Sequence, residues 1–86
     1  MPTVNIAITN AWTKIAADTN TDLLVTFDHP VTIAVATTAA DTPPTVLGHR
    51  LTRESALTRG VLGSGFVWAR TVGGAIPASI DLVVSK

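Results

Sequence analysis

Cysteine is absent from this 86-residue sequence, which excludes a disulfide framework and any metal site built on thiolates. Charge is also scarce, since only 14% of the residues are charged and the formal net charge is zero. No apolar run reaches the roughly 18 residues of a membrane-spanning segment. Residues 1–5 lack the basic and apolar stretches of a secretory signal, so we expect a mature start and no membrane partner.

The short length and the weak charge together favour self-association. A chain of this length is expected to form one domain, residues 1–86, and to bury only about 60–65% of the surface of its unfolded form. Apolar residues make up 47% of the chain, and few charges keep two copies apart. We therefore expect partner subunits to cover part of the apolar surface, so that the protein is a homo-oligomer. A sparingly charged monomer is the alternative.

Alternating apolar and polar residues predict an all-β fold, because successive side chains of a strand face opposite sides of the sheet. About seven or eight short antiparallel strands, separated by turn residues, are typical of a small β-sandwich, jelly roll or barrel, and we expect a single β-sandwich or jelly-roll-like domain. Residues 46–51 are less regular, and 52–57 are expected to form a connection or a turn of helix. The expected strands are 4–8, 12–16, 23–28, 31–37, 58–62, 66–72 and 78–85.

Turn residues predict two hairpins. His29-Pro30 is expected to join the strands 23–28 and 31–37, and Gly63-Ser64-Gly65 is expected to join 58–62 and 66–72.

The strand 66–72 is the most informative stretch of the chain. Phe66, Trp68, Arg70 and Val72 share one of its faces. We expect Phe66 and Trp68 to anchor the core on that face. Arg70 lies nearer the strand end and is expected to reach the rim toward a partner.

No constellation of residues in the sequence indicates catalysis or metal binding. The two histidines, His29 and His49, lack the short spacing of metal ligands. The glycines around Ser64 are followed by a strand-like segment rather than by the helix that a phosphate loop needs, and Ser64 does not fit a nucleophile elbow. The aspartates match no calcium loop; they are Asp18, Asp22, Asp28 and Asp41. We therefore expect no enzyme activity, no catalytic or metal-binding residue and no cofactor.

Basic and aromatic residues leave two further binding functions to consider. The arginines of the second half are too sparse to indicate a nucleic-acid partner, and we expect them to serve protein–protein contacts; they are Arg50, Arg53, Arg59 and Arg70. Trp12 and Trp68 could form a stacking platform for sugars, so a carbohydrate-binding β-sandwich remains an alternative. A small hydrolase is the weakest alternative, because no residues satisfy the geometry of an active site.

Several segments together resemble small β-rich structural proteins of tailed bacteriophages. The likeness spans roughly residues 23–86 and is carried by Pro43-Pro44, Gly48-His49-Arg50-Leu51, Gly65-Phe66-Val67-Trp68-Ala69-Arg70 and Ala78-Ser79-Ile80-Asp81-Leu82-Val83-Val84. The resemblance implies a head-decoration or cement subunit, or else a small head-fibre, tail-fibre or baseplate component. Such proteins work as oligomers, often trimers, bound to the major capsid protein or another virion protein. It also implies location in the virion, after assembly in the host cytoplasm, and no catalytic residues.

Candidate interface residues lie beside turns rather than in the clean core alternation. Together with Arg70 they are Leu57, Val61, Leu62 and Ile76.

Overall fold

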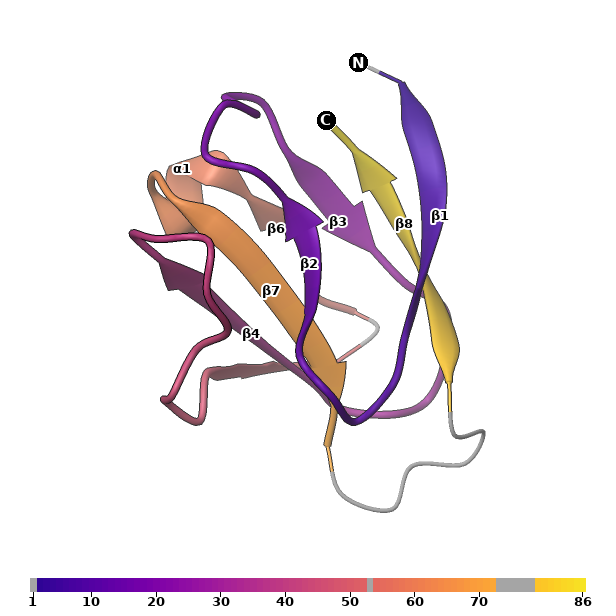
Figure 1. Ribbon diagram of the computed structural model, residues 1–86. Helices are drawn as coiled ribbons and strands as arrows, with labels where there is room; N and C mark the ends of the chain where they lie inside the picture. The colour runs from indigo at the N-terminus through magenta and orange to yellow at the C-terminus, as the bar shows by residue number, and fades with distance from the viewer. Residues whose placement is uncertain (1, 53, 73–78) are drawn as a thin grey trace.

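The computed structural model describes residues 2–52, 54–72 and 79–86. The expected all-β class is confirmed, because strands form nearly all of the regular structure and the one helix in the described residues is a single turn (Figure 1). In chain order the elements are β1 (Thr3–Ile8), β2 (Thr13–Ala16), β3 (Leu24–Thr26), β4 (Ile33–Thr38), β5 (His49–Leu51), β6 (Leu57–Thr58), α1 (Arg59–Leu62), β7 (Phe66–Thr71) and β8 (Ile80–Ser85).

The strands form two four-stranded antiparallel sheets with the orders β1-β8-β3-β6 and β2-β7-β4-β5. The first strand pairs with the last, the second with the seventh, the third with the sixth and the fourth with the fifth. The strand pairs are therefore nested, as in one long folded hairpin. The pairs β1–β8 and β3–β6 belong to the first sheet, and the pairs β2–β7 and β4–β5 belong to the second. Pairing of β3 with β8 and of β4 with β7 then joins the two pairs side by side within each sheet.

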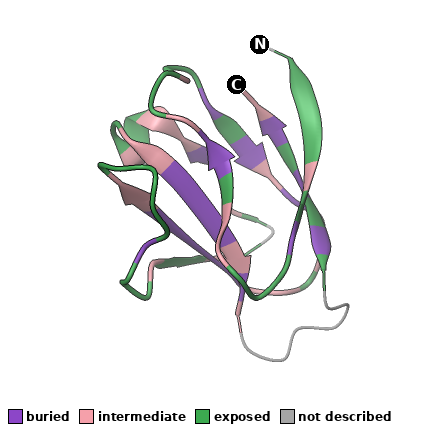
Figure 2. Ribbon diagram, in the orientation of Figure 1, coloured by how far each residue is buried: buried purple, intermediate pink, exposed green. Residues whose placement is uncertain are grey.

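One hydrophobic cluster draws buried residues from both sheets. The expected alternation is clear in β8, where Ile80, Leu82 and Val84 are buried while Asp81 and Val83 are exposed (Figure 2). Each buried residue of β8 lies opposite an apolar residue of β1. The cluster consists of Ile8, Ile15, Ala16, Leu23, Val25, Phe27, Ile33, Val35, Leu57, Val67, Ala69, Ile80, Leu82 and Val84.

The core-facing side of β7 is the one opposite to that expected. Val67 and Ala69 are fully buried in the cluster, whereas Phe66 is only partly buried. Trp68 is 7% exposed, but it lies outside the cluster, on the outer face of its sheet beside Ala36. Both faces of this strand carry apolar residues, so alternation by itself does not choose between them. The register with β4 determines which face of β7 is turned toward the core, because Ala69 lies opposite Val35, and Val35 faces the core.

The outer face of this second sheet is covered rather than solvated. β4 is buried on both faces over Ile33–Ala36, as the burial pattern of the strand shows. The following loop, 39–48, covers part of this face and includes the buried Pro44. Asp41 of the loop forms a salt bridge of 2.8 Å with Lys14 of β2. At the far end of the loop, Gly48 lies against the ring of Trp12. This cover explains why alanines on the outer side of β4 are buried.

Neither expected hairpin is present. The strands β3 and β4 lie in different sheets, so the turn at His29-Pro30 is a crossing between sheets. A hydrogen bond of 2.8 Å from the Val31 amide to the His29 carbonyl tightens this crossing. The expectation failed because the close spacing of two strands in the sequence does not require them to pair. β3 pairs instead with β6 and β8, which come later in the chain.

The second expected hairpin fails because 58–62 is mostly helical. Only Leu57–Thr58 is extended, and it pairs with β3, while Arg59–Leu62 forms α1. Gly63 ends the helix with a φ of 80°, and its amide donates to the Arg59 carbonyl at 2.7 Å. Two positive-φ glycines in this turn, Gly63 and Gly65, thus connect a helix to β7 instead of one strand to another.

Candidate functional site: an apolar pocket between two sheet edges

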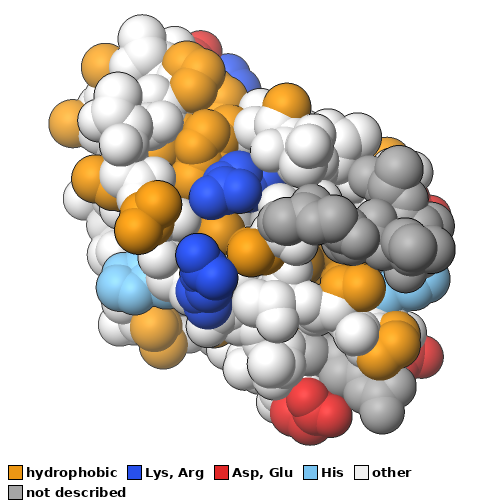
Figure 3. Space-filling view, turned by 90° about the horizontal axis from the view of Figure 1, so that it is seen from below, with side chains coloured by type: hydrophobic (Ala, Val, Ile, Leu, Met, Phe, Trp, Pro, Cys, Tyr) orange, Lys and Arg blue, Asp and Glu red, His pale blue; other side chains and the backbone are white. Residues whose placement is uncertain are grey.

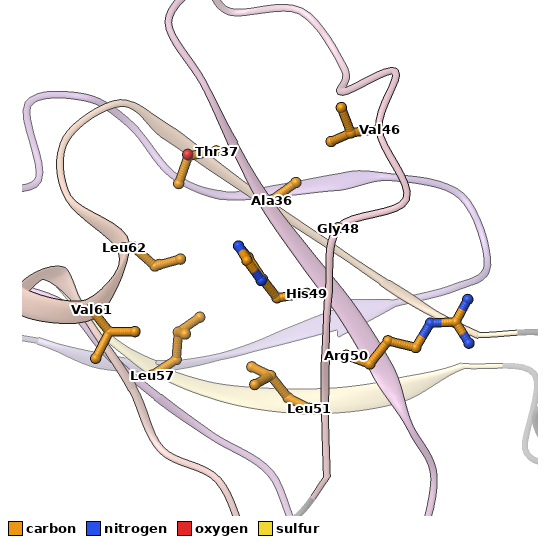
Figure 4. A pocket seen from close by; sticks show the side chains of 10 residues that line it. All are labelled: Ala36, Thr37, Val46, Gly48, His49, Arg50, Leu51, Leu57, Val61 and Leu62. Atoms are coloured by element: carbon orange, nitrogen blue, oxygen red, sulfur yellow. The ribbon is translucent and has the colours of Figure 1, made fainter.

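A pocket of about 470 Å³ opens where an edge of one sheet approaches an edge of the other (Figure 4). The edge strands are β5 and β6, and α1 and the end of the loop 39–48 complete the walls. Cavities of this size lie within the range of small-molecule and side-chain binding pockets, about 300–1,000 Å³. The lining residues are Ala36, Thr37, Val46, Gly48, His49, Arg50, Leu51, Leu57, Val61 and Leu62.

Strand alternation in β5 determines which side chains enter the pocket. Figure 4 shows His49 and Leu51 on the pocket side of the strand and Arg50 pointing away from the pocket. Leu51 also packs against the hydrophobic core, so the floor of the pocket is continuous with it. His49 points toward Leu62 of α1, and its imidazole is the one titratable group that enters from the described lining (Figure 4).

Three large aliphatic residues at and beside the pocket stay in water, and we call them the apolar rim. Val61 is 75% exposed, Val46 is 61% exposed, and the adjacent Leu47 is 72% exposed. Exposed aliphatic side chains that gather around a hollow are typical of contact surfaces, because covering them removes apolar area from water. The rim lies on a loop and on a one-turn helix, so both elements present their side chains outward.

The structure brings together three of the candidate interface residues. Leu57, Val61 and Leu62 all line the pocket. Leu57, however, is 3% exposed and belongs to the core, so only a group that enters the pocket could reach its side chain. Leu62 is partly buried against the core. Arg70 does not line the pocket; its guanidinium lies over Trp12. Ile76 lies outside the described residues.

Sequence reasoning missed Val46 and Leu47. A usable signal was present, because two large apolar residues follow a proline pair in a segment without strand alternation. Apolar residues in such a loop have no core face to fill, so exposure was the simplest expectation for them.

Arg70 takes part in an aromatic layer on the outer face of the second sheet. Its guanidinium lies 5.1 Å from the ring centre of Trp12, and the ammonium of Lys14 lies 5.4 Å from that of Phe66. Figure 3, a view of the molecule from below, also shows Lys and Arg side chains beside hydrophobic ones. With Arg70 over Trp12 and with Trp68 almost fully buried, the rings do not form an open stacking platform.

The chemistry of the site is that of apolar contact. Among the described residues, no three His, Cys, Asp or Glu side chains come together as metal ligands would. In the same part of the chain, no helix has the length and apolar character needed to cross a membrane. No protein-family model, no curated protein and no solved structure matches this chain.

Proposed function

We propose that this chain is a non-enzymatic structural protein of a bacteriophage virion, namely a head-decoration or cement subunit that binds the major capsid protein. The observation that carries the proposal is the apolar rim of Val46, Leu47 and Val61, which is exposed beside a pocket of about 470 Å³. The resemblance of residues 23–86 to small phage structural proteins supports it independently.

The fold in its finer detail belongs to the same proposal: a β-sandwich of the jelly-roll type. The nested strand pairing, first with last and so on inward, supports it, as does the division into two four-stranded sheets. A jelly roll has eight strands in two sheets, and it occurs in viral capsid proteins and in lectins. The fold is therefore compatible with a virion role but does not select it.

Attachment would work by burial. Covering the rim removes apolar surface from water at about 25 cal/mol per Å², and a side chain of the capsid protein can enter the pocket beside His49. Self-association would add stability that a core of this size cannot supply alone. The mechanism requires no bond to form or break, which agrees with the absence of catalytic motifs from the sequence.

The test is to locate the protein in particles. Virions produced from the genome that encodes the chain are purified on a density gradient, and each fraction is quantified by mass spectrometry. We expect the protein to co-sediment with heads, in a copy number comparable to that of the major capsid protein. Enrichment on isolated tails would support the fibre or baseplate alternative instead. Absence from all particles would contradict a virion role.

A pair of variants tests whether the apolar rim makes the contact. Val61→Lys places a charge in the rim and should abolish decoration of empty heads. Leu24→Lys is the matched control, because Leu24 is also an exposed aliphatic residue but does not line the pocket; it lies on β3 with Thr58 opposite. Decoration by the Val61 variant at the level of the control would exclude the rim as the contact surface. A glycan array with the unmodified protein covers the carbohydrate-binding alternative.

A further inference from the structure

Among the described strands, four lie at sheet edges, and three of these are poor templates for another strand. β6 is two residues long, and β5 is three residues long and carries Arg50. β2 carries Lys14, and its register shifts between Lys14 and Ala16. Short length, charge and bulges are the features by which sheet edges avoid pairing with other chains.

The fourth edge, β1, has none of these features. It is six residues long, with the sequence Thr-Val-Asn-Ile-Ala-Ile, and contains no charge, proline or glycine. Its register with β8 is continuous over the whole strand. Among the described residues, no strand pairs with the other side of β1, and most of the strand is exposed (Figures 1 and 2). Only its C-terminal end approaches β7, where the Thr9 carbonyl just beyond the strand accepts a hydrogen bond of 2.8 Å from the Thr71 amide.

The backbone groups at this edge can be assigned from one hydrogen bond. The Lys86 amide donates to the Pro2 carbonyl at 3.2 Å, so Pro2 directs its backbone toward β8. In an antiparallel pair this direction alternates, and Val4, Ile6 and Ile8 therefore face β8 as well. The hydroxyls of Thr3 and Ser85 lie 2.7 Å apart, as expected where opposite residues exchange no backbone bonds. The outward N–H and C=O groups thus belong to Thr3, Asn5 and Ala7.

We infer that β1 is a self-pairing edge, which binds β1 of a second copy in antiparallel orientation with Asn5 opposite Asn5 and Thr3 opposite Ala7. This register uses the outward N–H and C=O groups of all three residues and continues the sheet from one copy into the next. The inference rests on the self-association in the proposed function and names its surface.

The second copy fits this edge better than another occupant for two reasons. Residues directly opposite each other share a face, so Val4 meets Ile6 of the second copy on the core side. Val4 is 43% exposed at present, and this contact covers it. An uncharged strand also pairs with its copy without repulsion, whereas a β2–β2 pair would bring together two copies of Lys14. Because β1 of each copy is used in this two-fold contact, the assembly stops at a dimer, in contrast to the trimer that the family resemblance implies.

The first test measures assembly and amide exchange on the full chain. Sedimentation equilibrium should give a dimer at micromolar concentration. In the dimer, the amides of Asn5 and Ala7 should exchange slowly, and dilution should make them fast, while Ile6 and Ile8 stay protected by β8 at both concentrations. A monomer, a trimer, or fast exchange at Asn5 in the assembled protein would overturn the inference.

The second test uses two lysine variants on the same sheet face. Asn5→Lys places two lysines opposite each other and should raise the dimer dissociation constant at least about tenfold at low salt, with partial recovery at high salt. Val83→Lys is the control, because Val83 lies beside Asn5 but one strand further in, on β8. It should leave the dissociation constant unchanged. Equal weakening by both variants would place the contact on the face of the sheet and overturn the edge. Circular dichroism verifies that each variant is folded.

The two proposals fail separately. If the dimer forms through β1 but the protein is absent from particles, the virion function is wrong and the edge inference stands. If heads are decorated by a protein that never forms the β1 pair, the edge inference is wrong and the virion function stands.

Discussion

The indole N–H of Trp68 donates a hydrogen bond of 2.9 Å to the hydroxyl of Thr38, whose own proton goes to the Ala40 carbonyl at 2.7 Å. These bonds connect a nearly buried tryptophan of the outer sheet face to the first residues of the loop 39–48. The same loop ends in the apolar rim residues Val46 and Leu47. The packing of Trp68 and the position of these two rim residues therefore depend on the same loop.

Loss of this contact should destabilise the fold. Trp68→Ala removes a nearly buried side chain and should lower the free energy of unfolding by about 3–5 kcal/mol. Thr38→Val leaves the indole N–H without its acceptor and should lower that energy by about 1–3 kcal/mol. Urea denaturation of both variants measures these energies. An unchanged urea midpoint for Trp68→Ala would show that the outer layer contributes nothing to stability.

Arg59 should be the arginine on which the fold depends most. Its guanidinium donates to the carbonyl oxygens of Ala17, Asn20, Gly63 and Gly65 at 2.7–3.1 Å, which joins two loops that are far apart in the sequence. This structural role differs from the protein contact expected from the sequence. Arg59→Lys cannot reproduce the planar set of donors, and we expect a loss of at least about 2 kcal/mol. Arg50→Lys, at an exposed position, should cost less than about 0.5 kcal/mol.

Alanine substitutions in the turn before β7 should separate steric conflict from backbone strain. At Gly65, with a φ of 116°, a Cβ would lie 2.7 Å from the Thr38 carbonyl oxygen, so both effects act. At Gly63, with a φ of 80° and a ψ of −156°, a Cβ would meet nothing within 4 Å, and only the backbone strain of about 1–3 kcal/mol remains. Thermal unfolding should therefore give a larger loss for Gly65→Ala than for Gly63→Ala. A larger loss for Gly63→Ala would show that the backbone at Thr38 shifts easily to make room for the added methyl group.

The salt bridge between Lys14 and Asp41 should contribute little to stability. The two side chains are 38% and 52% exposed, so solvent screens their attraction. We expect Asp41→Asn to lower the free energy of unfolding by less than about 1 kcal/mol, and the difference from the unmodified protein should shrink further in high salt. A large, salt-independent loss would indicate that Asp41 positions the loop by a route other than charge.

Local patterns in the sequence predicted strands well and their partners poorly. Alternation placed β1, β4, β7 and β8 within a few residues, because side chains in a strand change face with every residue, whether the second face is exposed or covered. It could not place β3 beside β8, since pairing between distant strands depends on how the whole chain packs. It also could not select the core face of β7. Two apolar faces satisfy the pattern equally, and only the register with Val35 distinguishes them.

The candidate site was partly accessible from the sequence. Val61 and Leu62 were singled out because they interrupt the core alternation, and both line the pocket. The burial of Leu57 was not expected because β6 is too short to display an alternation of its own. The pocket itself requires knowledge that β5 and β6 are edges of two different sheets, which no local pattern contains.

The nested strand pairing also sets the order in which the protein can fold. The innermost pair, β4 with β5, joins residues close in the sequence, whereas β1 cannot pair until β8 has been synthesised. Closing so large a loop is slow, and β-rich topologies of this kind fold in milliseconds to seconds. On the ribosome β1 would stay unpaired until β8 has emerged. Its uncharged sequence makes that interval the one in which two nascent chains are most exposed to premature association.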